Sequence, residues 1–97
     1  MKYALVVKAE VIQDLSEAFE WYERQRSGLG SEFLDEVEKY FELITRSPEQ
    51  YQSHANQHIA VMYRFPYKIV YEIVQQIIVV YAVYHDKRGP EKLATRE

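Results

Sequence analysis

The chain has 97 residues, 47% of them hydrophobic and 14% aromatic, so it can build one modest core and is not a disordered chain. It contains no cysteine, which excludes a disulfide framework and a thiolate zinc site. Its net charge of −3 comes from 12 Lys and Arg against 15 Asp and Glu. A single domain over residues 1–97 is therefore expected.

The charge is unevenly distributed along the chain. Residues 1–53 hold 6 Lys and Arg against 11 Asp and Glu, which gives −5, whereas residues 54–97 hold 6 against 4, which gives +2. Domains that coat nucleic acid are usually strongly basic, so this balance argues against simple RNA or DNA coating. No apolar run is long enough for a signal peptide or for the roughly 20 residues that span a bilayer. We expect a cytoplasmic protein that has no membrane partner.

The first half of the sequence predicts a strand and two helices. The short, β-branched segment Tyr3–Lys8 is typical of a strand. Over residues 10–26, apolar side chains recur at spacings of four and three, which predicts a helix. Gly28 is expected to end this helix, and Ser31 to cap a second helix that continues until Pro48. Two helices joined by a short glycine link predict an antiparallel hairpin.

The second half predicts a β-meander. Residues 49–57 are polar and predict a loop. Residues 58–64 show a weak alternation of apolar and polar side chains, which is consistent with a strand. Residues 67–74 alternate clearly between two faces, and residues 77–84 are apolar on both, which is typical of a central strand. Between them, Gln75-Gln76 forms a tight turn in which neither residue favours a positive φ.

The predicted fold is therefore α+β with the order β-α-α-β-β-β. A small antiparallel sheet gains the N-terminal strand at one edge and carries the helical hairpin packed on one face.

Basic side chains gather where two of the predicted strands end. Arg64 precedes one strand, His85 follows the next, and Arg88 and Arg96 come after it. Guanidinium groups suit phosphate and carboxylate, and a histidine can move a proton near neutral pH. The cluster predicts an anion site with these four residues as candidates. The alternatives are a solvated charge or a surface ion pair for the arginines, and a structural hydrogen bond for His85.

Two other pairs of polar residues are weaker candidates for a functional site. His54 and His58 have a spacing that suits a metal on a helix, but no carboxylate or cysteine lies at a fitting distance, so no metal or other cofactor is expected. Lys68 is expected to pair with Glu72 on the same strand face.

The order of elements and four sequence segments resemble the RelE/ParE family of bacterial type II toxins, over nearly the whole chain. The segments are Ala18–Tyr22 with Gly28–Gly30 and Phe33-Leu34, then Ser47-Pro48, then Arg64–Tyr67 with Tyr71, and the ending His85, Arg88, Pro90 and Arg96. Leu93 departs from the family pattern, because that ending often has tryptophan there. The C-terminal tyrosine that RelE-type ribonucleases often carry is also missing.

The resemblance implies a plasmid-stabilisation type of toxin, encoded beside a cognate antitoxin and held inactive in a toxin–antitoxin hetero-oligomer. RelE-like members cleave mRNA on the ribosome without a metal, whereas ParE-like members are described as poisoning DNA gyrase. The first expectation is thus a metal-independent endoribonuclease with Arg64, His85, Arg88 and Arg96 as its catalytic residues. The alternatives are a gyrase inhibitor that needs no catalytic residues and a degenerate member that only binds its antitoxin. The acidic net charge argues against a nuclease that must bind rRNA.

Overall fold

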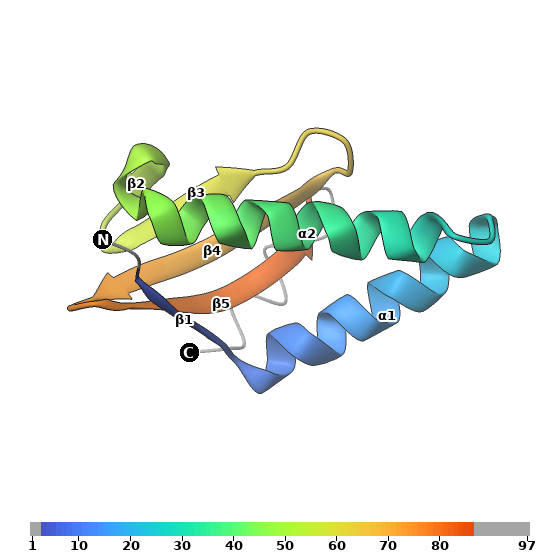
Figure 1. Ribbon diagram of the computed structural model, residues 1–97, viewed down its shortest axis with the longest axis horizontal. Helices are drawn as coiled ribbons and strands as arrows, with labels where there is room; N and C mark the ends of the chain where they lie inside the picture. The colour runs from blue at the N-terminus through green and yellow to red at the C-terminus, as the bar shows by residue number, and fades with distance from the viewer. Residues whose placement is uncertain (1–2, 87–97) are drawn as a thin grey trace.

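A computed structural model describes residues 3–86 of the chain, so Arg88, Leu93 and Arg96 lie outside the described residues. Two long helices lie across one face of a sheet (Figure 1). The elements are β1 (Ala4–Val7), α1 (Ala9–Gln25), α2 (Leu29–Arg46), the 3-10 helix η1 (Pro48–Gln50), β2 (Gln52–His54), β3 (Gln57–Val61), β4 (Tyr67–Val74) and β5 (Ile77–His85). Within residues 3–86, no helix is both long and apolar enough to cross a membrane.

The sheet has five strands in the order β1-β5-β4-β3-β2. Strands β2 to β5 form an antiparallel meander, and β1 adds to the edge of β5 as predicted. The α+β fold class is confirmed, but two details differ. The β1–β5 pair is parallel, so the sheet is mixed rather than antiparallel. The segment predicted as a loop over residues 49–57 contains η1 and β2, and it was missed because all three residues of β2 are polar and exposed.

A β-bulge between β4 and β5 keeps the core face of β5 apolar. Val70 pairs with Ala82, but Tyr71 pairs with Val80, so Tyr81 is the extra residue. Val80 and Val83 are three residues apart, and both belong to the core beneath the helices because the bulge restores the alternation.

The turn between the helices depends on two glycines that do different things. Gly28 has a φ of +89°, which is a left-handed conformation that glycine adopts without steric cost. Gly30 lies where the helices approach closely, since a Cβ there would be 2.5 Å from the carbonyl oxygen of Phe19. The predicted break between the helices is therefore confirmed, but Gly28 is the N-cap of α2 and does not end α1, whose last residue is Gln25 and whose C-cap is Arg26.

The predicted helix cap at Ser31 is wrong. Helix α2 begins at Leu29 with Gly28 as its N-cap, so Ser31 already lies within the helix. The carboxylate of Glu23 on α1 accepts hydrogen bonds from the backbone N–H groups of Gly28 (3.2 Å) and Gly30 (2.8 Å). These bonds, that from Gly28 first, lower the pKa of Glu23. A side chain from the preceding helix thus satisfies the first N–H groups of α2.

An aromatic cluster fills the space between the hairpin and the sheet end near the β3–β4 loop. The Phe33 ring is fully buried and lies 5.2 Å from Tyr22, 5.3 Å from Phe65 and 4.9 Å from Tyr67, measured between ring centroids. Such pairs contribute about 0.5–1.5 kcal/mol each beyond their buried area. The cluster fixes the β3–β4 loop against both helices.

Candidate functional site

Arg64 and His85 lie at the same end of the sheet. The backbone N–H of Asp86 donates to the carbonyl oxygen of Pro66 (2.7 Å), which joins the end of β5 to the loop that carries Arg64. Tyr67, at the start of β4, pairs in register with His85. Two of the four predicted site residues are therefore close in the fold. Whether the other two join them stays a prediction, because both lie outside the described residues.

The Arg64 side chain forms an ion pair with Glu32, near the start of α2. Its guanidinium carbon lies 5.3 Å from the ring centroid of Phe65, a cation–π contact that helps to hold it in place. Arg26 contacts the same carboxylate from the end of α1 at 3.4 Å. The two arginines, Arg26 first, lower the pKa of Glu32. The surface ion pair, one of the alternatives considered from the sequence, is what the structure shows for Arg64.

His85 lies on the helix-covered face of the sheet. Its ring meets that of Tyr67 edge-on, with centroids 5.3 Å apart and an interplanar angle of 78°. Residues paired across antiparallel strands point to the same face, and Tyr67 packs into the core beneath the helices. His85 is therefore partly covered at the rim of the aromatic cluster.

Lys68 and Asp86 form an ion pair on the opposite face of the sheet. Lys68 Nζ lies 3.0 Å from Asp86 Oδ1, and this contact raises the pKa of Lys68. The predicted Lys68–Glu72 pair is wrong, because Glu72 instead accepts a hydrogen bond from the Tyr81 hydroxyl (3.2 Å). Lys68 pairs in register with Tyr84, and Asp86 is two residues further along the same side of the chain.

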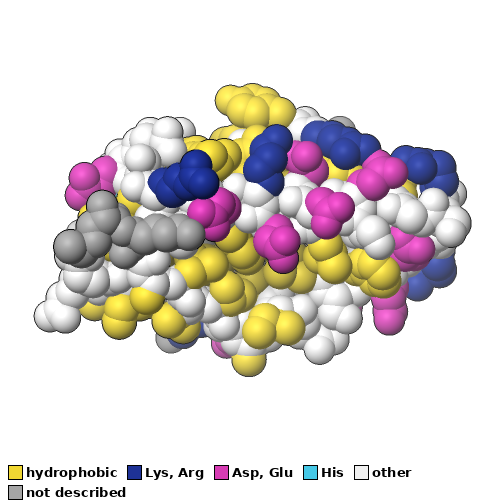
Figure 2. All heavy atoms as spheres, in the orientation of Figure 1, with side chains coloured by type: hydrophobic (Ala, Val, Ile, Leu, Met, Phe, Trp, Pro, Cys, Tyr) yellow, Lys and Arg dark blue, Asp and Glu magenta, His cyan; other side chains and the backbone are white. Residues whose placement is uncertain are grey.

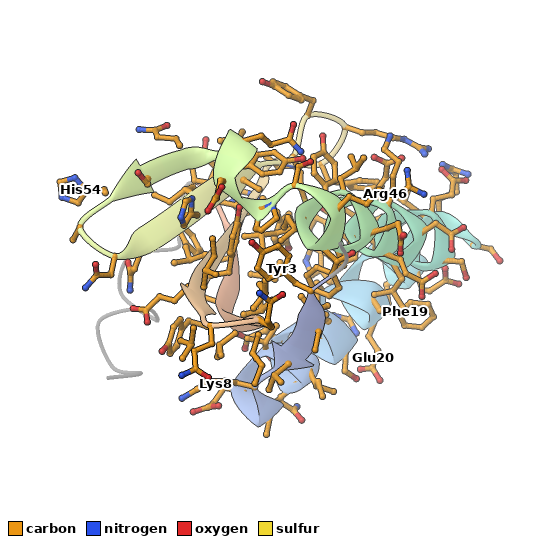
Figure 3. The ribbon with its side chains drawn as sticks, turned by 60° about the vertical axis from the view of Figure 1, so that its left-hand side comes forward. Tyr3, Lys8, Phe19, Glu20, Arg46 and His54 are labelled. Atoms are coloured by element: carbon orange, nitrogen blue, oxygen red, sulfur yellow. The ribbon has the colours of Figure 1, made fainter. Side chains whose placement is uncertain are left out.

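His54 and His58 are not placed to share a metal ion. His58 stacks on Tyr71 with centroids 5.2 Å apart and has its Nδ1 3.2 Å from the Tyr51 carbonyl oxygen. His54 lies at the tip of the β2–β3 hairpin, where its ring points away from the rest of the molecule (Figure 3). Among residues 3–86 no group of three or more His, Cys, Asp or Glu side chains could hold a metal ion.

On the face of the molecule that Figure 2 shows, positive and negative side chains alternate over α2. Figure 2 shows Lys and Arg side chains beside Asp and Glu side chains over α2, with hydrophobic side chains gathered in the lower half, where β1 and α1 lie. A shallow groove of about 350 Å³ lies between β1 and α2, at the far end of the sheet from His85. It is lined by Tyr3, Leu5, Glu38, Phe41, Glu42 and Thr45.

The sequence and the fold both have known relatives. Residues 5–90 match the ParE toxin family of the type II toxin–antitoxin system, parDE. The chain belongs to this family. No curated protein matches it.

Two solved structures are similar to this chain in fold. A chain of the chromosomal ParDE toxin–antitoxin system from P. aeruginosa superposes with a TM-score of 0.77 at 9% identity, covering 87% of this chain and 96% of that one. A double arginine-to-alanine mutant of the E. coli toxin RelE in the free state superposes with a TM-score of 0.73 at 15% identity, covering 99% of this chain and 94% of that one. At these identities the likeness shows the RelE/ParE-like fold alone.

The resemblance read from the sequence is thus confirmed at the level of the family. The protein is a ParE-family toxin of a type II toxin–antitoxin system, and its expected partner is a cognate antitoxin.

Proposed function

We propose that this toxin acts by binding DNA gyrase and inhibiting it, rather than by cleaving RNA. Membership of the ParE family supports the proposal, because ParE-like toxins are described as gyrase poisons. The observation that carries it is the pairing of charges at the sheet end. Arg64 binds Glu32 and Lys68 binds Asp86, so each of these cations already has a carboxylate of the same chain.

The paired charges suit a protein partner better than a phosphate backbone. Nucleic-acid binding depends on an excess of positive charge that displaces counterions from the phosphates. Half-exposed arginine and tyrosine side chains, by contrast, are the types that dominate protein interfaces. Arg64 has a side chain that is 52% exposed and follows Tyr63, which is 88% exposed. This end of the sheet is therefore our candidate surface for gyrase.

Metal-independent mRNA cleavage is the second candidate, because His85 and Arg64 lie at the same end of the sheet. Cleavage through the 2′-hydroxyl needs one group that removes a proton and another that donates one. His85 is the one histidine at this end of the sheet within residues 3–86, and its ring packs against Tyr67. The titratable groups Glu32, Lys68 and Asp86 at this end are each engaged in an ion pair.

A supercoiling assay with purified toxin and purified gyrase tests the proposal. We expect the wild-type toxin to inhibit supercoiling of relaxed plasmid and Arg64→Ala to lose most of that inhibition. His85→Gln should inhibit like the wild type, because no proton transfer is involved. Arg46→Ala is the matched control, since Arg46 is also an exposed arginine with a carboxylate partner on α2.

The same proteins are then added to translating ribosomes, and the ends of the mRNA are mapped. New cuts that disappear with His85→Gln, together with unaffected gyrase, would overturn the proposal in favour of the ribonuclease.

A further inference from the structure

A compact cluster of recognition side chains lies where the helical hairpin meets the β3–β4 loop, which passes beside α2 in Figure 1. We call Arg26, Glu32, Tyr63 and Arg64 the arginine cluster. Its members come from the end of α1, the start of α2 and the β3–β4 loop. Segments distant in the sequence thus converge on one exposed surface, because Arg64 and Glu32 are 32 residues apart.

The two arginines of the cluster have one carboxylate hydrogen-bond partner between them. Both contact Glu32, whereas Glu23, which also acts electrostatically on Arg26, accepts from the backbone N–H groups of Gly28 and Gly30. The contacts of Arg26 with Glu32 are 3.4–3.5 Å long, whereas charge-assisted hydrogen bonds are typically about 2.7–2.9 Å. The side chains of Arg26 and Arg64 are 59% and 52% exposed. Exposed ion pairs add little to stability, so a second carboxylate could join these arginines at little cost to the fold.

Tyr63 directly precedes Arg64 in the chain and exposes an aromatic side chain. It is 88% exposed, the highest value among the exposed large hydrophobic side chains within residues 3–86. The core already receives its neighbour Phe65, so folding does not require Tyr63 to be aromatic. Tyrosine and arginine side chains are enriched at the sites that dominate binding energy in protein interfaces.

We propose that the arginine cluster binds an acidic segment of the cognate antitoxin. A carboxylate of the antitoxin binds Arg26 and Arg64 beside Glu32, and an apolar side chain packs on Tyr63. The antitoxin is the partner that family membership implies. Residues 1–53 carry a net charge of −5, so an acidic segment is repelled over much of this half of the chain, and the exposed guanidinium groups of Arg26 and Arg64 favour its binding at the arginine cluster.

The proposal rests on family membership and not on gyrase as the target. The test uses the antitoxin encoded beside the toxin gene, purified and titrated calorimetrically into full-length toxin at low and high salt. Arg26→Ala and Tyr63→Ala should each raise the Kd about tenfold or more, as truncation at the centre of an interface does. Arg26→Ala should also reduce the salt dependence of binding. Arg46→Ala, an exposed arginine outside the cluster, should leave the Kd unchanged.

Glu32→Gln distinguishes this proposal from simple loss of structure. Because Glu32 competes for both arginines, its neutralisation should lower the Kd severalfold while the other variants raise it. Every variant must first show a wild-type melting temperature. An unchanged Kd in Arg26→Ala and Tyr63→Ala would overturn the proposal, as would weaker binding by Glu32→Gln.

The outcome of the antitoxin titration does not depend on whether gyrase is the target of the toxin. The gyrase assay uses toxin without antitoxin, so a failure there leaves the antitoxin titration unaffected. If Arg26→Ala kept its antitoxin affinity, the antitoxin assignment would fall, whatever the effect of this variant on gyrase.

Discussion

The aromatic cluster and the charged end of the sheet share the segment Arg64–Tyr67, but the side chains of this segment differ in burial. Phe65 and Tyr67 turn inward and are 5% and 7% exposed, whereas Arg64 between β3 and β4 turns outward with a side chain that is 52% exposed. The inward residues hold the loop against the helices, and the outward residue is then presented at a fixed place. Stability and recognition should therefore be separable by substitution.

Phe33→Ala should have the largest effect, because Phe33 contacts three other rings and is fully buried. Large-to-small changes of this kind cost about 3–5 kcal/mol. We expect urea denaturation to show a loss of that size, and both antitoxin binding and toxicity to disappear with the fold. A loss below about 1 kcal/mol would mean that the cluster does not hold the hairpin on the sheet.

The two glycines of the helical turn should respond differently to alanine. Gly30→Ala places a Cβ 2.5 Å from the Phe19 carbonyl oxygen, so the helices must separate, at about 1–3 kcal/mol. Gly28→Ala has open space around the new Cβ and meets only the cost of its left-handed φ of +89°, about 1–2 kcal/mol. Thermal unfolding of both variants checks the order. If Gly28→Ala lowered the melting temperature more than Gly30→Ala, the left-handed φ of Gly28 would constrain the turn more than the close approach of the helices at Gly30.

The acid sensitivity of the helical turn should depend on Glu23. Its pKa is lowered in the folded protein below the ordinary value of 4.5, so the unfolded state binds more protons as pH falls. The stabilisation is fully present above that ordinary value and is lost as the pH drops through the lower folded value. Urea unfolding of the wild type and Glu23→Gln at neutral and acidic pH measures it. The variant should lose less stability on acidification, and equal losses would contradict the assigned role.

Arg64→Ala should have the smallest effect on stability and a large effect on function. Exposed ion pairs contribute about 0–1 kcal/mol, so the melting temperature should fall by at most about 4–8 °C. Growth inhibition in cells that express the variant should nevertheless be lost. A strongly lowered melting temperature would mean that the ion pair with Glu32 contributes substantially to stability. Stability and recognition would then not be separable at Arg64.

The sequence predicted the elements that apolar periodicity marks, and it failed where a backbone pairing or a helix cap leaves no apolar pattern. The helical stripes and the alternation in β4 and β5 made the hairpin and the meander predictable. Strand β2 was missed because its backbone pairing with β3 leaves no apolar pattern. Ser31 was assigned as a cap because serine is a common N-cap residue, whereas the Glu23 carboxylate, which accepts from Gly28 and Gly30, lies on the preceding helix and leaves no cap pattern in the sequence.

The candidate site was predictable only in part. That Arg64 and His85 share one end of the sheet follows from strand order and register. The partners of the cations do not, because Glu32 reaches Arg64 only after the hairpin has packed on the sheet, and Asp86 reaches Lys68 through the β4–β5 register. The roles of Arg88 and Arg96 stay predictions.

The most direct test of gyrase inhibition follows DNA and protein synthesis together in bacteria within minutes of inducing the toxin. Labelled thymidine and labelled amino acid are measured in parallel, and mRNA ends are mapped from the same culture. We predict that thymidine incorporation falls first, with a DNA-damage response and intact mRNA, and that Arg64→Ala abolishes the fall. A prompt fall in amino-acid incorporation with new mRNA ends, absent in His85→Gln, would contradict the account and make the protein a ribonuclease.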